Sequence, residues 1–323
     1  MKAIVYRKYG PPHVLKLEEV EKPTPGDGEV LVKVHSASIN AGDWHLLRGT
    51  PFLVRLIAGP LKPKHQILGT DVAGTVEAVG RNVGEFKPGD EVFGDMSRHG
   101  FGSFAEYVCV AESAALVLKP ASMKFEDAAA MPSAAVTALQ AIRDKGQIQP
   151  GQKVLVNGAS GGVGTFAVQI AKSFGAEVTG VCSTRNVDMV RSIGADMVID
   201  YTKEDFTKNG RHYDLIVDAA AYRSITECKP ALGPEGIYVL IGGSTAQFLQ
   251  TLYLGPWSSM TAKKKIRSLL VKPNKKDLLF IQGLHGAGEV VPVIDRQYPL
   301  SDVPEAIRYL EDEHARGKIV ITM

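Results

Sequence analysis

A glycine-rich turn between an apolar run and an amphipathic run is the feature of this sequence with the clearest chemistry. Residues 153–164 read KVLVNGASGGVG, and residues 165–176 continue as TFAVQIAKSFGA. Small residues let a backbone approach a pyrophosphate, and the free N–H groups at a helix start stabilise its negative charge. We therefore predict a dinucleotide site formed by Ala159, Ser160, Gly161, Gly162, Val163 and Gly164. Because Ala159 replaces the first glycine of the usual G-x-G-x-x-G pattern, a tight turn without a ligand is the alternative.

The end of the next apolar run predicts which dinucleotide is bound. NAD-binding proteins usually carry an acid there that binds the ribose 2′-hydroxyl. Residues 182–185 read CSTR instead, and a guanidinium beside small hydroxyl groups suits a 2′-phosphate. We predict NADPH as the cofactor, bound through Ser183, Thr184 and Arg185, with Tyr201 beside the adenosine phosphate. The alternatives are that Arg185 caps the helix opening at Asn186 and that Tyr201 is a surface tyrosine.

The elements that must position these residues follow two patterns. Short β-type runs at 30–34, 72–79 and 105–110, after a first strand at the N-terminus, predict an all-β first part. From residue 125 an alanine-rich helix is followed by strands that alternate with helices, which favours a parallel, doubly wound sheet. The expected strands are 153–157, 177–182, 197–199, 215–218, 238–241, 290–294 and 318–321, and the expected helices are 163–174, 186–193, 275–284 and 303–313.

Length and composition limit the possible classes of protein. A chain of 323 residues exceeds the size of one hydrophobic core, so we expect two domains. A net charge of +2 is too small for a nucleic-acid partner. The cysteines, Cys109, Cys182 and Cys228, have no paired spacing, which argues against disulfides and fits the cytoplasm. No apolar run reaches the roughly 18 residues of a membrane span, and the N-terminus lacks a signal-peptide pattern.

Motifs along most of the chain carry a family resemblance. They are SINAGDWHLLRG (38–49), LGTDVAGTVEAVG (68–80), KPGDEVFG (87–94), GSFAEYV (102–108), NGASGGVG (157–164), GAEVTGVCST (175–184), GADMVIDY (194–201) and HARGKIVI (314–321). The sequence resembles the quinone oxidoreductase branch of the medium-chain dehydrogenase/reductases. The resemblance implies an α/β protein with a GroES-like, β-rich substrate domain (1–121, completed by 272–323) and a doubly wound Rossmann domain (122–271). It also implies hydride transfer from a nicotinamide to an activated double bond or a quinone.

The resemblance also indicates that zinc is absent. Zinc-dependent relatives hold a catalytic zinc with cysteine, histidine and a second cysteine, and the matching positions are Asn40, Thr70 and Ser133. Their amide and hydroxyl groups cannot supply thiolate and imidazole ligands. Residues 93–104 also lack the cysteines of the structural zinc lobe. Without zinc, reduction of an electron-poor enone or quinone is easier than oxidation of a simple alcohol.

Residue roles follow from the same resemblance. Related reductases bind the nicotinamide ribose through the asparagine of an N-x-x-D motif and a threonine of the interdomain helix, here Asn40 and Thr137. Asp43 and Arg48 are expected to form an ion pair or to face substrate, with structural support favoured for Arg48. A tyrosine that often donates the proton is replaced by Trp44 and His45, so His45 or water protonates the enolate. The catalytic set is Asn40, Asp43 and His45, and Gly242, Gly317 and Lys318 complete the cofactor set.

Three functions remain open at this stage. The first is an NADPH-dependent reductase of small electrophilic enones or quinones, the second is a zinc-independent alcohol or ketone oxidoreductase, and the third is an NADPH-binding sensor without turnover. Residues 238–267 are expected to end the sheet and to pair in a homodimer, unless lysines 263–265 guard that edge. The apolar segment 248–257 either lines a substrate pocket or packs as a loop.

Overall fold

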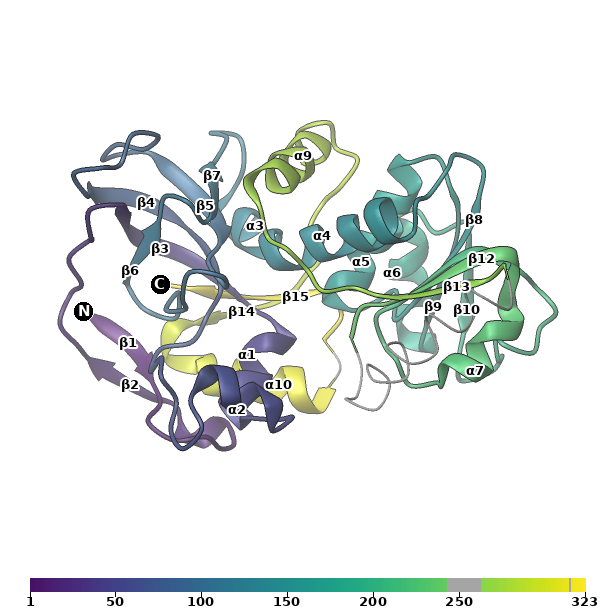
Figure 1. Cartoon of the computed structure of the whole chain (residues 1–323), viewed down its shortest axis with the longest axis horizontal. Coiled ribbons are helices and arrows are strands. Elements are labelled where there is room, and N and C mark those ends of the chain that lie inside the picture. Colours follow the sequence, from purple (N-terminus) through teal and green to yellow (C-terminus); the bar gives the residue numbers. More distant parts are fainter. Residues whose placement is uncertain (243–262, 314) are drawn as a thin grey trace. The chain divides into compact units, whose positions relative to one another are not determined.

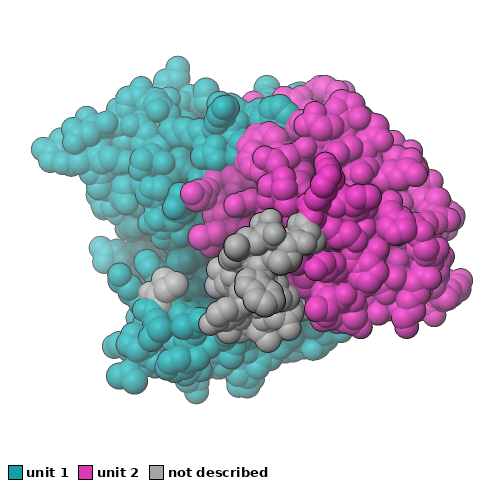
Figure 2. All heavy atoms as spheres, turned by 45° about the vertical axis from the view of Figure 1, so that its right-hand side comes forward, with its two compact units in different colours: residues 1–133, 273–280, 294–323 teal, residues 134–272, 281–293 magenta. Residues whose placement is uncertain are grey.

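The computed structural model of the chain describes residues 1–242, 263–313 and 315–323. They form two compact units, which Figure 2 shows in different colours. Unit 1 contains residues 1–133, 273–280 and 294–323, and unit 2 contains residues 134–272 and 281–293. The expected domain boundaries, 121/122 and 271/272, lie before the 133/134 and 272/273 boundaries of the units, and residues 281–293, expected in the substrate domain, lie in unit 2. The apolar segment 248–257 lies outside the described residues.

Unit 2 is built on a six-stranded parallel sheet with the order β10-β9-β8-β11-β12-β13. Figure 1 labels β8, β9, β10, β12 and β13 of this sheet. Its strands are largely buried, as expected for a sheet covered on both faces. The chain runs outward from β8 in one direction and then resumes at β11 on the other side, so the order reverses between β8 and β11. The predicted doubly wound Rossmann sheet is confirmed. Its strands are β8 (Lys153–Asn157), β9 (Glu177–Cys182), β10 (Met197–Asp200), β11 (Tyr213–Asp218), β12 (Leu232–Leu240) and β13 (Lys265–Ser268).

Helices connect the parallel strands of unit 2. The helix α5 (Gly162–Ser173) follows β8 and buries Phe166 and Ile170 completely. The short helix η3 (Thr184–Asn186) and α6 (Val187–Ser192) follow β9, and α7 (Ile225–Cys228) follows β11. The connections after β8, β9 and β11 each return the chain to the start of another parallel strand, so the loops that follow these three strands lie at one edge of the sheet.

Unit 1 contains an antiparallel pair and a larger, mainly antiparallel sheet. The larger sheet has the order β14-β15-β3-β4-β5-β7, and β6 also pairs with β3. Valines of β3, β4 and β5 alternate toward one core. The strands are β1 (Lys2–Val5), β2 (Lys16–Glu19), β3 (Glu29–Ile39), β4 (Asp71–Val79), β5 (Glu91–Asp95), β6 (Tyr107–Ala111), β7 (Ala115–Leu118), β14 (Ile294–Pro299) and β15 (Lys318–Thr322).

The expectation of an all-β first part is incomplete. Two helices, α1 (Ala41–Arg48) and α2 (Leu53–Ala58), interrupt it. The carboxylate of Asp43 accepts a hydrogen bond from the backbone N–H of Asn40, which stabilises the start of α1, and Gly49 ends it with φ 60°. A capping signal, which hydrophobic periodicity does not reveal, therefore sets this helix.

The predicted strand 290–294 is wrong. Residues 290–293 are not in a strand, and β14 begins only at Ile294, in parallel with β15. Pro292 lacks a backbone N–H group and cannot donate to a strand ladder, so it separates the apolar residues before it from β14. The remaining helices are α3 (Phe125–Ala130), α4 (Pro132–Leu139), a π-helical turn (Gln140–Lys145), α9 (Lys275–Gly286), α10 (Val303–Glu313) and the short turns Pro12–Val14, Lys229–Ala231 and Leu300–Asp302.

In the described part of the chain, no helix is both long and apolar enough to cross a membrane. All three cysteines are free.

The edge strand β13 bears on the predicted homodimer. Among the described strands β13 pairs with β12 alone, so its other side is an edge. Lys263 pairs with Glu235 at 3.2 Å, and Lys264 donates to the Lys229 carbonyl. We keep the homodimer as a prediction and expect light scattering at micromolar concentration to give twice the chain mass. A monomer mass would instead indicate that lysines 263–265 prevent this edge from pairing with a second chain.

Candidate active site and cofactor site

The turn after β8 departs from the usual glycine pattern for a visible reason. Gly158 has φ 81°, a left-handed conformation that side chains rarely adopt, and it supplies the tight turn one residue before Ala159. The backbone N–H groups of Gly158 and Ala159 both donate to the carbonyl of Val181 in β9. Ala159 is fully buried and lies beside Gly180. A Cβ atom added to Gly180 would be 3.1 Å from the methyl group of Ala159. A glycine at position 159 is therefore not needed to form the turn.

The helix α5 begins directly at this turn and offers unpaired donors. Among the described residues, the N–H groups of Gly162, Val163 and Gly164 donate no hydrogen bond. Gly161 precedes the helix, and a Cβ atom there would touch only the Gly158 carbonyl oxygen, at 3.5 Å. A Cβ atom on Gly164 would be 2.0 Å from the same oxygen. The start of α5 thus combines three donors with little side-chain bulk, which fits a dinucleotide pyrophosphate.

Two predicted cofactor segments of unit 2 come together. The Asn186 side-chain amide donates to Ser160 Oγ at 3.0 Å and to Ser183 Oγ at 3.2 Å. This amide links the glycine turn to the end of β9. Arg185 lies in η3, between Ser183 and Asn186 in the sequence. Tyr201 follows β10 and is 54% exposed.

The sequence prediction missed Asp200 at this place. Thr184 Oγ1 donates to Asp200 Oδ2 at 2.6 Å, and Lys203 pairs with the same carboxylate at 3.3 Å. Hydrogen bonds from Thr184 and Thr202 lower the pKa of Asp200, so this carboxyl is ionised at neutral pH. The expected strand ended at residue 199, so the carboxylate that β10 places beside Thr184 was not considered.

A second missed group lies where the strand order reverses. Asn157 ends β8 and donates to Asp218 Oδ1 at 2.9 Å, and Asp218 ends β11. The Tyr238 hydroxyl of β12 donates to Asp218 Oδ2 at 2.6 Å. Ligands of such sheets bind at the carboxyl ends of the strands near this reversal. These hydrogen bonds therefore join the strand ends at which the cofactor is expected to bind.

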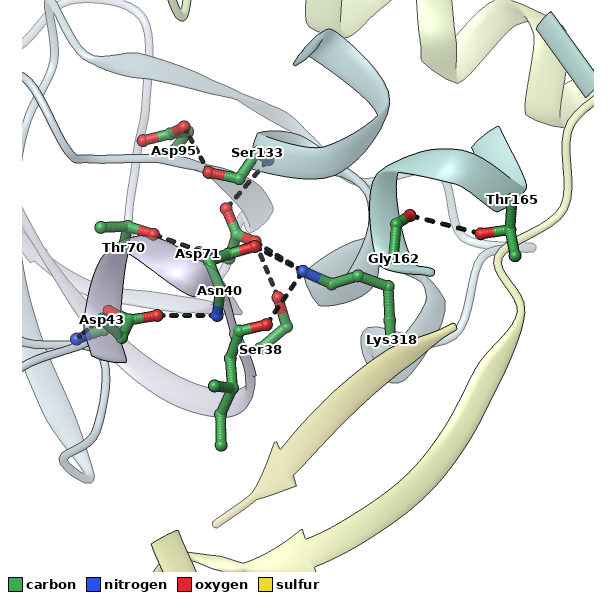
Figure 3. A network of polar contacts seen from close by, with 12 residues as sticks. Ser38, Asn40, Asp43, Thr70, Asp71, Asp95, Ser133, Gly162, Thr165 and Lys318 are labelled. Carbon is green, nitrogen blue, oxygen red and sulfur yellow. Dashed lines mark hydrogen bonds and ion pairs between the residues drawn. The ribbon is translucent and has the colours of Figure 1, made fainter. Parts of the chain in front are cut away.

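In unit 1 the N-x-x-D motif lies in a buried polar cluster (Figure 3). Asn40 Nδ2 donates to Thr70 Oγ1 at 3.2 Å and to Asp71 Oδ2 at 2.9 Å. Lys318 Nζ donates to Asn40 Oδ1 at 2.6 Å and lies 3.7 Å from Asp71 Oδ2. Asp43 is completely buried, and its carboxylate accepts from the backbone N–H groups of Asn40 and Gly69. The predicted residues Asn40, Asp43 and Lys318 are thus close neighbours.

The three positions that the family resemblance matches to zinc ligands also lie in this cluster. Besides Asn40 and Thr70, the backbone N–H of Ser133 donates to Asp71 Oδ1 at 3.0 Å, and its hydroxyl donates to Asp95 Oδ2 at 2.9 Å. Ser38 donates to Asp71 as well, at 2.7 Å. The described residues contain no group of three or more histidine, cysteine, aspartate or glutamate side chains able to hold a metal.

Burial dominates the electrostatics of the cluster. It raises the pKa of Asp43 to about 7, although the two backbone donors oppose this shift. It also raises the pKa of Asp71 to about 6 and lowers that of Lys318, and in each case the opposite charge of the other counteracts burial. The carboxylate and the ammonium therefore depend on each other for charge compensation.

The other predicted residues of this motif have separate partners. Arg48 pairs with Glu311 rather than with Asp43, which agrees with structural support by Arg48 and corrects the suggested Asp43 pair. His45 Nδ1 lies 2.9 Å from the carbonyl oxygen of Thr50. Because that oxygen only accepts, Nδ1 carries a hydrogen and Nε2 is the nitrogen left for other partners.

The remaining predicted cofactor residues are placed as follows. Thr137 lies in α4, and Gly242 follows β12 as the last described residue before the gap at 243–262. Gly317, with φ 123°, immediately precedes Lys318 at the start of β15.

Comparison with known proteins identifies the family. The family model described as alcohol dehydrogenase GroES-like domain matches residues 26–121, and the one described as zinc-binding dehydrogenase matches residues 193–321. A chloroplastic quinone-oxidoreductase QR1 of Triphysaria versicolor is 36% identical over 99% of this chain and 98% of its own. A chloroplastic NADPH-dependent alkenal/one oxidoreductase of Arabidopsis thaliana is 34% identical, covering 99% of this chain and 79% of its own. The solved quinone oxidoreductase of Coxiella burnetii superimposes with a TM-score of 0.90 at 30% identity, covering 100% and 99% of the two chains.

An α/β fold that joins a GroES-like unit to a parallel Rossmann unit defines a class of oxidoreductases. The chain belongs to the medium-chain dehydrogenase/reductase superfamily and, within it, to the quinone-oxidoreductase-like branch. The family and fold expected from the sequence motifs are confirmed.

Proposed function

We propose that this protein is an NADPH-dependent reductase of α,β-unsaturated carbonyl compounds or quinones that works without zinc. The observation that carries the proposal is the cluster in unit 1, where the amide of Asn40 and the hydroxyls of Thr70 and Ser133 stand at the positions that the family resemblance matches to zinc ligands. Relatives named as quinone and NADPH-dependent alkenal/one oxidoreductases support the acceptor class and a nicotinamide cofactor. A bound nicotinamide dinucleotide would supply the hydride.

The residues of unit 2 fit this cofactor. The unpaired N–H groups of Gly162, Val163 and Gly164 would bind the pyrophosphate. At the end of β9, Ser183 and Arg185 would bind the 2′-phosphate, and no carboxylate stands in that strand end. The negative charge of Asp200 disfavours a phosphate at Thr184. The ion pair of Asp200 with Lys203 partly offsets this negative charge.

The residues of unit 1 orient the nicotinamide half and the acceptor. Both N–H groups of the Asn40 carboxamide are donated within the cluster, and one lone pair of Oδ1 accepts from Lys318. The second lone pair of Oδ1 would accept a hydrogen bond from a ribose hydroxyl. Holding hydride donor and acceptor in register is the main catalytic effect expected without a metal. A proton completes enone reduction, and His45 Nε2 or water would deliver it to the enolate.

The cofactor assignment predicts a clear preference. NADPH should bind more tightly than NADH, and Arg185→Ala should remove about 1.5 to 3 kcal/mol of that discrimination, the typical contribution of a charge-assisted hydrogen bond. Titration calorimetry with both nucleotides measures it. Arg191→Ala is the matched control, because Arg191 is an exposed arginine of α6 that pairs with Asp188. Equal affinities of the unaltered protein for NADPH and NADH would refute the assignment.

The proton donor is tested separately. If His45 protonates the enolate, His45→Ala should lose enone reduction. Quinone reduction should suffer less, because water can protonate its oxyanion product. Steady-state kinetics with one enone and one quinone measure both effects. An unchanged enone rate would leave water as the donor.

The proposal as a whole is tested by a screen of NADPH consumption against quinones, enones and ketones. We expect turnover with electron-poor quinones or enones. Turnover with simple ketones or alcohols alone would favour a zinc-independent alcohol or ketone oxidoreductase. Tight NADPH binding without turnover of any acceptor would favour a sensor.

A further inference from the structure

The ammonium of Lys318 is an internal cation of unit 1. The side chain is only 3% exposed, and its Nζ donates to the Ile39 carbonyl at 3.2 Å and to Asn40 Oδ1 at 2.6 Å. Asp71 Oδ2 lies 3.7 Å away and is the opposing charge. Two of the three ammonium hydrogens are donated to the Ile39 and Asn40 oxygens, and Asp71 balances the charge as an ion-pair partner beyond hydrogen-bonding distance.

Backbone pairing fixes this position. β15 runs antiparallel to β3, and the register pairs Ile319 with Ile39. Lys318 and Asn40 therefore flank the same pair of strands, one at the start of β15 and the other just after β3. The left-handed φ of 123° at Gly317 brings the chain into the strand immediately before Lys318. The sheet itself thus places the ammonium beside the carboxamide.

These contacts determine which way the Asn40 carboxamide points. Its oxygen faces a cation, and its nitrogen faces the Asp71 carboxylate and the Thr70 hydroxyl (Figure 3). A flipped amide would place N–H groups against the ammonium and its oxygen against the carboxylate, and both contacts would be repulsive. One orientation is therefore strongly favoured, and it leaves the second lone pair of Oδ1 as the free polar site of this side chain.

We propose that Lys318 is a positioning residue that locks the Asn40 carboxamide with Oδ1 available to accept a hydroxyl of the nicotinamide ribose, rather than a lysine that binds the cofactor phosphates. The inference rests on the function proposed above. It assigns Asn40 as a hydrogen-bond acceptor toward the cofactor and Lys318 as the group that orients it.

A double substitution separates orientation from charge balance. Lys318→Met alone leaves Asp71 buried without its cation and should strongly lower the melting temperature. Lys318→Met combined with Asp71→Asn removes both charges and should restore much of that stability. The double variant still lacks the donor that holds Asn40 Oδ1, so the amide loses its fixed orientation.

Binding measurements read out the orientation without catalysis. Calorimetry compares NADPH with adenosine 2′,5′-bisphosphate, which carries the 2′-phosphate but no nicotinamide half. For the double variant we expect NADPH to bind about fivefold more weakly, the effect of about one lost neutral hydrogen bond. The affinity for the bisphosphate should remain unchanged. kcat should fall along with the NADPH affinity, whereas the KM for the acceptor should change little.

Lys119→Met is the matched control. Lys119 is equally buried, with a side chain 3% exposed, and it pairs with Glu91 at 2.9 Å. Its Nζ donates to the carbonyls of Pro120 and Met123 and makes no contact with Asn40. This variant should lose stability but keep NADPH affinity and kcat.

Three outcomes would overturn the inference. The first is a double variant with restored stability, normal NADPH affinity and normal kcat, which would reduce Lys318 to charge balance. The second is equal weakening of NADPH and the bisphosphate, which would make Lys318 a phosphate ligand. The third is an unaltered protein that binds neither NADPH nor NADH, which would also refute the proposed function. NADPH binding without turnover would refute only the proposed reaction, because the calorimetric comparison would still decide the role of Lys318.

Discussion

Replacing Asn40 with alanine is expected to lower kcat on the order of a hundredfold with every accepted substrate, because small misplacements in hydride-transfer geometry have effects of that size. The carboxamide links Lys318, Asp71 and Thr70, and its loss removes the hydrogen bonds to all three side chains. NADPH should still bind through its phosphates, since these contacts come from other residues. Steady-state kinetics together with calorimetric binding of adenosine 2′,5′-bisphosphate measure the two effects.

Stability must be followed in the same Asn40 variant. Unpaired buried groups at Lys318 and Asp71 are expected to cost about 1 to 3 kcal/mol of unfolding free energy. Kinetics measured well below the melting temperature separate this loss from the catalytic one. An Asn40→Ala protein with unchanged kcat for every accepted substrate would show that the N-x-x-D motif does not position the cofactor.

Two glycines of the turn after β8 are expected to respond in opposite ways to alanine. A Cβ atom on Gly164 would be 2.0 Å from the Gly158 carbonyl oxygen, which is backbone and has little room to move. Gly164→Ala should therefore lower the free energy of unfolding by about 3 kcal/mol, through overpacking. A Cβ atom on Gly161 would lie 3.5 Å from that oxygen, and the backbone there has φ −84° and ψ 174°, which alanine accepts.

Gly161→Ala should therefore fold normally and bind NADPH more weakly. The added methyl group lies where the backbone must approach the pyrophosphate, so we expect at least about a tenfold loss of affinity, as for one charge-assisted hydrogen bond. Urea unfolding and calorimetry distinguish the two variants. A Gly161→Ala protein with normal NADPH affinity would mean that the pyrophosphate does not lie at the start of α5. A stable Gly164→Ala protein would show that the turn can relax.

The sequence predicted the elements with continuous local signals best. β8 and β9 were predicted to the residue, because each is a short, mainly apolar run that follows a glycine-containing turn. The strand expected at 290–294 failed because apolar character outweighed Pro292 in the interpretation. The helix α1 was not expected because its start depends on a side-chain cap by Asp43 and not on a periodic pattern.

The cluster around Asn40 was predicted only in part. The family resemblance supplied Asn40, Asp43 and Lys318 as separate site residues, and Asp71, Ser38 and Asp95 were missed. Their association depends on the register between β15 and β3, which joins residues 318 and 40 across most of the chain. No local spacing encodes such a pairing. Asp71, which follows Thr70 in the motif LGTDVAG, was a usable signal, because a buried carboxylate needs a cation to balance its charge.

Zinc analysis combined with an activity assay decides whether the proposed reduction by NADPH proceeds without a metal. Protein dialysed against a chelator, with its zinc content determined by elemental analysis, is assayed for NADPH oxidation with a quinone and an enone. We predict far less than one zinc per chain and undiminished turnover after chelation. One zinc per chain, with turnover lost on chelation and restored by zinc, would show that the enzyme depends on zinc.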